Sequence, residues 1–333
     1  MKIVLPLIAV IVLVLLAFVG VEIANLRFLF GVVIPYAAIA TFIIGFIYRV
    51  VKWGRSPVPF SIPTTAGQQK SLPWIKQNKL DNPSSTLGVI GRMFLEVFLF
   101  RSLFRNTKTE LREGTKLAYG SEKYLWLAGM AFHWSFLIIF IRHFRFFIEG
   151  VPPVVKMIEG LDSFLQIGAP LLYMTDVILL SAVTYLIFRR LFMPLIKYIS
   201  LPADYFPLFL IFGLGASGVI MRYFSKVHIV GVKQLVMGLI SFNPVSMEIM
   251  QSIGVVFYIH LFLLSVLLVY FPLSKLMHMG GVFLSPTRNM PNDSRMVRHI
   301  NPWNYPVHVH TYEEYENDFR DKMKKAGIPV EKE

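Results

Sequence analysis

Six apolar stretches alternate with polar segments along the chain, and each is long enough, or nearly so, to cross a bilayer as a helix. A hydrocarbon core about 30 Å thick needs roughly 20 apolar residues in an α-helix. The predicted spans are Ile3–Val21, Phe28–Val50, Tyr124–Ile148, Phe164–Phe188, Tyr205–Met221 and Gly254–Met277. The pattern therefore predicts an all-α integral membrane protein with a six-helix transmembrane bundle.

The polar segments divide the chain into an N-terminal helix (1–27), a membrane domain (28–279) with a loop at about 51–123, and a tail (280–333). Lys2 before the first span is also typical of a secretory signal, but no small-x-small cleavage site follows, so we expect a retained helix. The loop contains an apolar stretch, Leu87–Phe104, that three charged residues interrupt. Burying those charges in lipid is costly, so an amphipathic helix on the membrane surface is expected there.

Composition and charge agree with a membrane protein and orient it. Hydrophobic residues make up 55% of the chain and charged residues only 16%, against about 25% in soluble domains. The net charge of +13 is therefore assigned to cytoplasmic loops and not to a nucleic-acid partner. With six alternating spans, 26 of the 33 lysines and arginines fall on one side, which places both termini in the cytoplasm. The absence of cysteine excludes disulfides, a thiol nucleophile and thiolate-held iron–sulfur clusters.

Four of the eight histidines lie in or at the ends of two predicted spans. His260 and His278 are eighteen residues apart, which is five helical turns, so both lie on one face of the last span. His133 and His143 are ten residues apart in the third span, about 80° from a shared face. Because the two spans run in opposite directions, His133 and His278 lie near the cytoplasm, and His143 and His260 lie nearer the outside.

Two histidine pairs on antiparallel helices suit two hemes stacked across the bilayer, each iron held by two imidazoles. The two spacings differ in length, because ten helical residues rise about 15 Å and eighteen rise about 27 Å. Both pairs can therefore be level only if the helices tilt or the last span kinks at Pro272. Arg142 and Arg145 flank His143 and are candidates for heme propionates or for lipid phosphates. A proton relay or transporter that uses these histidines, with Asp176, stays open as an alternative. A membrane di-iron enzyme is excluded because no His-x-x-His or Glu-x-x-His motif occurs.

The other histidines are His228, His299, His308 and His310, which we expect to be solvated. Two of them lie in "VHVH", where two ligands on a loop are a weak signal for a metal. The tail also contains "NPWNYP", whose aromatic residues between prolines favour a docking surface for a partner protein. No catalytic residue is predicted.

Several stretches resemble the gamma subunit of respiratory nitrate reductase, a membrane cytochrome b family. "HLFLLSVLLVYFPLSKLMH" and "FHWSFLIIFIRHF" are similar to its two ligand helices, and "FLFGVVIPYAAIATFIIGFIYR" is similar to its first helix. The resemblance implies a core of five helices, to which this chain adds one at the N-terminus. The tail "SPTRNMPNDSRMVRHINPWNYPV" instead resembles cytochrome b subunits of the sulfite-reduction-associated Dsr membrane complexes.

The resemblance implies an electron-transfer subunit with two b-type hemes that exchanges electrons with menaquinol. His133 and His278 would hold the inner heme, and His143 and His260 the outer heme. Lys156 in "PPVVK" matches a family lysine at the quinol site, so Lys156 and His143 are candidates for binding the quinol. The implied partners are membrane lipid, other subunits of a membrane redox complex, and a cytoplasmic iron–sulfur protein related to heterodisulfide reductase. Dissimilatory sulfite or sulfur metabolism is the implied setting.

Overall fold

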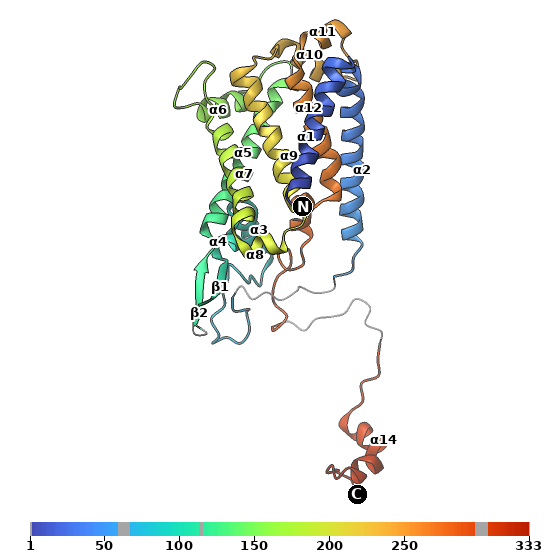
Figure 1. Ribbon diagram of the computed structural model, residues 1–333. Helices are drawn as coiled ribbons and strands as arrows, with labels where there is room; N and C mark the ends of the chain where they lie inside the picture. The colour runs from blue at the N-terminus through green and yellow to red at the C-terminus, as the bar shows by residue number, and fades with distance from the viewer. Residues whose placement is uncertain (1, 59–66, 113–115, 297–305, 333) are drawn as a thin grey trace.

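A bundle of long helices dominates the molecule (Figure 1). The computed structural model describes residues 2–58, 67–112, 116–296 and 306–332. The long helices are α1 (Val4–Phe18), α2 (Ile34–Gly54), α5 (Lys123–His143), α7 (Met174–Phe192), α9 (Pro202–Val219) and α12 (Val255–Tyr270). The π-helical turns η1 (Val19–Ile23), η2 (Leu29–Val33) and η5 (Ile220–Phe224) lengthen α1, α2 and α9. The predicted all-α membrane fold is confirmed.

Five helical segments in the described part of the chain are long and apolar enough to cross a membrane. They are Val4–Ile23, Leu29–Gly54, Lys123–Phe146, Pro202–Phe224 and Val255–Leu273. Helix α7 packs against α5 and α9 in the same bundle, but Asp176, Arg189 and Arg190 charge its two ends. The chain is therefore a multi-pass membrane protein, and α7 as a sixth span stays a prediction.

The shorter elements gather at the two ends of the bundle (Figure 1). One end carries α3 (Thr86–Leu99), α4 (Arg101–Arg105), an antiparallel hairpin of β1 (Thr107–Arg112) and β2 (Lys116–Ser121), α8 (Pro194–Ile199) and α13 (His278–Gly281). The other end carries α6 (Pro153–Asp162), α10 (Ile229–Ile240) and α11 (Met247–Ser252). Lys2 Nζ donates to the carbonyl of Tyr198 in α8 at 3.2 Å, so the N-terminus lies at the α3 and α8 end. Helix α14 (Tyr312–Lys325) follows in the tail.

Helix α12 lies between α1, α2 and α9 and supplies much of the core. Its side chains Tyr258 and Leu263 are fully buried, whereas large apolar side chains such as Ile44 on α2 point outward, as expected for a surface that faces lipid. Close helix contact needs small residues. A Cβ on Gly45 of α2 would lie 2.7 Å from the ring of Pro272, so only glycine lets α2 pass the end of α12.

The boundaries of two predicted spans are wrong. The fourth span was expected to begin at Phe164, but α7 begins at Met174, because Gly168 and Pro170 interrupt the apolar run. The last span was expected to continue to Met277, but α12 ends at Tyr270, just before Pro272. Proline lacks the N–H that a helix needs and clashes with the preceding turn. Two short 3₁₀ turns, η6 (Phe271–Leu273) and η7 (Lys275–Met277), then lead to His278.

Helix α3 is amphipathic, as the sequence predicts for a surface helix. Leu87, Ile90 and Phe94 form an exposed apolar stripe, and Arg92 is buried on another face. The predicted docking motif at 301–305 and His299 lie outside the described residues.

Candidate histidine site in the membrane bundle

The four span histidines form two facing pairs, one near each end of α5. His133 of α5 faces His278 at the start of α13, with ring centres 6.0 Å apart and ring planes at 82°. His143, the last residue of α5, faces His260 of α12, with ring centres 6.3 Å apart and planes at 5°. The structure thus brings together the partners that the antiparallel directions of the two spans predict.

Nδ1 of each of the four imidazoles is hydrogen-bonded to a protein oxygen. The acceptors are Gly129 O for His133 (2.8 Å), Ile139 O for His143 (2.7 Å), Lys275 O for His278 (2.9 Å) and Ser217 Oγ for His260 (2.9 Å). A carbonyl can only accept, so Nδ1 carries the proton in three of the rings. Ser217 donates its own proton to Leu214 O at 2.9 Å, so it too accepts from the imidazole. Nε2 is therefore the free lone pair in all four rings, the arrangement that orients histidines as metal ligands.

The spacing of the pairs fits an iron between each two imidazoles. With metal–nitrogen bonds of about 2.0 Å and ring centres about 1.15 Å beyond each Nε2, two axial imidazoles have ring centres about 6.3 Å apart. The observed separations of 6.0 and 6.3 Å match this value. Helices α5 and α12 are both fully described and do not pack closely backbone to backbone, although their side chains face each other. Few residues of α5 are buried by the protein, so most of the surface of this helix is open to a ligand or to lipid.

The break after α12 removes the conflict between the two histidine spacings. A continuous helix would separate His260 and His278 by about 27 Å, against about 15 Å for His133 and His143. In the structure the helix stops at Tyr270, and Ser274 has extended backbone angles (φ −118°, ψ 179°) between the two 3₁₀ turns. The chain therefore does not follow a straight helical axis to His278. Gly280 then passes close to Phe46 of α2, because a Cβ added to Gly280 would lie 3.3 Å from the Phe46 ring.

Aromatic rings line the inner pair, and part of that lining comes from the loop between α2 and α5. Phe100 and Phe132 both meet the His133 ring edge-on at 4.9 Å. Phe100 sits at the junction of α3 and α4 with a left-handed backbone (φ 48°). Two indole N–H groups hold this junction on α5: Trp126 Nε1 donates to Leu99 O at 2.8 Å, and Trp134 Nε1 donates to Phe98 O at 3.1 Å. The surface helix thus supplies one ring beside His133, while His133 and His278 both stay exposed.

Near the outer pair, the two arginines that flank His143 already have protein partners. Arg142 is 8% exposed and pairs with Asp162 Oδ2 at 2.5 Å and Asp176 Oδ1 at 2.9 Å. Arg145 pairs with Glu159 Oε1 at 2.9 Å. Both arginines were candidates for propionates or lipid phosphates, and that role is now a proposal that must compete with these carboxylates.

The carboxylates around Arg142 extend into a network that the sequence did not reveal. Tyr223 donates to Asp176 Oδ2 at 2.9 Å, and Thr175 donates to Asp162 Oδ2 at 2.6 Å. The guanidinium groups of Arg142 and Arg222 lie 3.7 and 3.8 Å from the centre of the Tyr173 ring. The network joins α5, α6, α7 and the end of α9. The sequence analysis named Asp176 as a possible relay group, but its partners Arg142 and Tyr223 are 34 and 47 residues away.

Lys156, the candidate quinol residue, lies on α6 at the outer end of the bundle. Arg142 of α5 pairs with Asp162, and Arg145, in the turn just after α5, pairs with Glu159. These ion pairs hold α6 beside the end of α5 that carries His143. The side chain of Lys156 is exposed, and its amine forms no hydrogen bond or ion pair within the described residues. The structure therefore places Lys156 on the element next to His143 and leaves its amine free.

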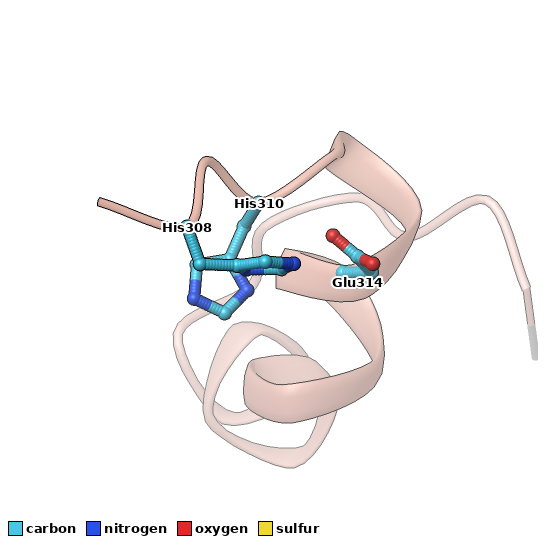
Figure 2. A group of neighbouring side chains, drawn as sticks. All are labelled: His308, His310 and Glu314. Carbon is cyan, nitrogen blue, oxygen red and sulfur yellow. The ribbon is translucent and has the colours of Figure 1, made fainter. Parts of the chain in front are cut away.

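A second group of possible metal ligands lies outside the bundle, in the tail. Figure 2 shows His308 and His310 beside Glu314 near the start of α14; their ligating atoms all lie within 4.8 Å of one another, and all three residues are exposed. Glu314 also accepts from the Thr311 backbone N–H at 2.9 Å as part of a capping box. The sequence revealed the two histidines, and the Thr-x-x-Glu capping pattern was the available signal for the third group.

Most of the chain is similar in sequence to known proteins. The family model described as nitrate reductase gamma subunit matches residues 89–298. A protein of Archaeoglobus fulgidus named "Hdr-like menaquinol oxidoreductase cytochrome b-like subunit" is 46% identical over 279 residues, which is 83% of each chain. A protein of Archaeoglobus profundus with the same name is 43% identical over 274 residues, or 81% of each chain. The family match includes all four paired histidines and begins inside α3, so α1 and α2 lie outside it.

Proposed function

Because the chain belongs to the nitrate reductase gamma subunit family, as the sequence resemblance indicated, we propose that it is the di-heme membrane subunit of a menaquinol-linked redox complex. The observation that carries this proposal is the geometry of the imidazoles. The two rings of each pair face each other, with ring centres 6.0 Å apart in one pair and 6.3 Å in the other. In all four rings Nδ1 is hydrogen-bonded and Nε2 is free.

His133 and His278 would hold the inner heme, and His143 and His260 the outer heme. Iron with two axial imidazoles has no open coordination site and supplies one-electron redox chemistry. The chain's own groups orient the ligands: three backbone carbonyls and the Ser217 hydroxyl keep each Nδ1–H engaged, which makes Nε2 a stronger donor.

Menaquinol is the proposed electron donor, and its site is proposed beside the outer pair. A quinol loses two protons with its two electrons, so the site needs a hydrogen-bonding group near an accessible edge. Lys156 on α6 has a free amine, and the α5–α6 ion pairs hold that helix beside the end of α5 that carries His143. The names of the two Archaeoglobus relatives, which are menaquinol oxidoreductase subunits, support the quinone type.

Electrons are proposed to leave at the opposite end, to a cytoplasmic iron–sulfur protein related to heterodisulfide reductase. The relatives' designation "Hdr-like" supports this partner, and the charge asymmetry of the loops supports an inner end formed by α3, α8 and the tail. Both termini would then face the cytoplasm. Sulfite or sulfur metabolism remains the setting that the tail's resemblance implies.

A proton-coupled transporter, or an anchor subunit without heme, is the competing function. The buried Asp176–Tyr223 contact near His143 is the observation that favours it, because such chains of titratable groups carry protons in membrane proteins. The two functions differ in whether the histidines bind iron.

A pyridine hemochrome assay on the purified full-length protein, with a protein determination, separates the two functions. We expect two b-type hemes per chain and a reduced-minus-oxidised spectrum with b-type bands that appear on adding a menaquinol analogue. A folded protein purified from heme-supplied cells without these bands would overturn the proposal and favour the transporter.

A further inference from the structure

Arg92 is a buried cation without a partner. Its side chain lies on α3 and is 4% exposed. Within the described part of the chain it forms no hydrogen bond and no ion pair, and its Nη1 is fully shielded from solvent. A guanidinium has five N–H donors and is charged at every physiological pH, so burial without an acceptor is unfavourable. A site that buries such a group points to an anion that binds there.

The charges around Arg92 reinforce this conclusion. Burial lowers the pKa of the Arg92 guanidinium, Glu96 opposes that change, and Arg288 lowers the pKa further. The Glu96 carboxylate is itself bound by the backbone N–H and hydroxyl of Ser102. Arg288 is partly buried, and its side chain has no partner among the described residues. The segment that carries Arg288 is held against the loop before α3, because the Asn292 backbone N–H donates to Pro83 O at 2.7 Å. The one acid near Arg92 is already engaged.

Both arginines lie in segments that lead to the inner histidine pair. Helix α3, which carries Arg92, ends at the junction where Phe100 packs on His133. Arg288 follows His278 by ten residues, in the chain that leaves α13. At the outer end, in contrast, Arg142 pairs with two carboxylates through Nη1 and Nη2.

We propose that Arg92, together with Arg288, forms a site for an oxyanion between α3 and the chain that leaves α13, at the end of the bundle that holds the inner histidine pair. Guanidinium groups bind carboxylate and phosphate in the same two-pronged geometry. Two sources supply this chemistry at the membrane surface: a propionate of the heme held by His133 and His278, which rests on the proposed function, and the phosphate of a lipid headgroup beside the apolar stripe of α3.

The test compares Arg92→Gln and Arg92→Lys with Arg55→Gln, which removes an exposed arginine of the same loop, in full-length purified protein. A spectroelectrochemical titration resolves the two hemes, with the inner one identified as the wave that His278→Ala lacks. If a propionate binds, Arg92→Gln disfavours reduction of the inner heme about tenfold, a shift of about 59 mV to lower potential. Arg92→Lys should restore most of the potential, and Arg55→Gln should leave it unchanged.

Native mass spectrometry supplies the second arm, with vesicle-derived anionic phospholipid as the probe. Loss of a tightly bound phospholipid in Arg92→Gln, with both heme potentials unchanged, assigns the site to lipid phosphate. Arg288→Gln is measured in parallel and serves alone if Arg92→Gln does not fold. A folded variant of either arginine that retains both potentials and the bound lipid overturns the anion site. Absence of heme from the wild-type protein refutes the proposed function instead, and the lipid measurement then decides the site.

Discussion

Ser217 offers a direct test of the outer histidine pair, because it is the one Nδ1 acceptor that is a side chain. In the other three rings the acceptor is a backbone carbonyl, which substitution cannot remove. Ser217→Ala removes the buried hydroxyl that accepts from the Nδ1–H of the half-buried His260 ring. We expect the outer heme to bind more weakly and the inner heme to be spared.

The size of the effect follows from the lost hydrogen bond. A buried donor left unsatisfied costs about 1–3 kcal/mol, and loss of a hydrogen bond behind a metal-bound histidine typically weakens metal affinity about 10- to 100-fold. The bond also makes Nε2 more basic and so stabilises the more positively charged ferric iron. Its loss should therefore raise the midpoint potential of the outer heme. Heme release to apomyoglobin and a redox titration measure the two effects.

Ser265→Ala is the matched control. Ser265 is also buried, lies on α12 like His260, and donates to Leu261 O at 2.8 Å without touching a histidine. It should leave heme affinity and both potentials as in the wild type. Equal heme release from the Ser217→Ala and wild-type proteins would show that the hydroxyl does not orient His260, and would count against axial ligation by that ring.

Four further predictions follow from the same structure. His278→Ala should lose the inner heme and keep the outer one in a hemochrome assay; loss of both hemes from a folded protein, or of neither, contradicts the pairing. A cysteine at Gly160 on α6 should react with an impermeant maleimide in whole cells, and one at Gly54 should not; the reverse pattern would invert the topology. Both positions can accept a cysteine, because a Cβ at either one meets no neighbour. Lys156→Ala should slow heme reduction by a menaquinol analogue sharply and leave dithionite reduction normal, whereas a wild-type rate would make Lys156 a surface lysine. In the tail, backbone N–H groups of residues 331 and 332 and the Arg320 guanidinium hold the pKa of Glu316 below its usual range. That stabilisation is present above the ordinary glutamate pKa and is lost as the pH falls through the lowered folded-state value. The protection factors of the α14 amides, which correct for the pH dependence of intrinsic exchange, should therefore fall in acid and stay constant between pH 6 and 8.

Local pattern was enough to predict most of the membrane architecture. A helix in lipid must satisfy its own backbone, so a run of about 20 apolar residues reports a span without reference to the rest of the chain. The ends of the spans were less predictable where a turn interrupts an apolar run, as at Phe164–Tyr173 and after Tyr270. Proline and glycine there were visible in the sequence, but apolarity alone does not distinguish helix from turn.

The histidine spacings were also readable, because ten and eighteen residues on antiparallel helices can meet in only one pairing. Tertiary structure decided how the pairing is achieved: α12 breaks near Pro272, and the acceptors for the four Nδ1 atoms come from the local turns and from Ser217 on a neighbouring helix. A serine in an apolar helix gives no sign in sequence of which ring it faces.

The arginines show most clearly what sequence alone leaves undecided. Arg142 lies next to His143 in sequence and so was a natural candidate for a propionate, but the docking of α6 and α7 on α5 gives it two carboxylates. Arg92 lies in a loop that sequence assigns only to the membrane surface, and folding buries its side chain without a partner among the described residues, at the end of the bundle that holds the inner pair. Apolar periodicity is a property of one segment and survives in the sequence. Charge pairing depends on which segments meet, because Coulomb energy in a low-dielectric interior is set by distances of a few ångströms between residues far apart in the chain.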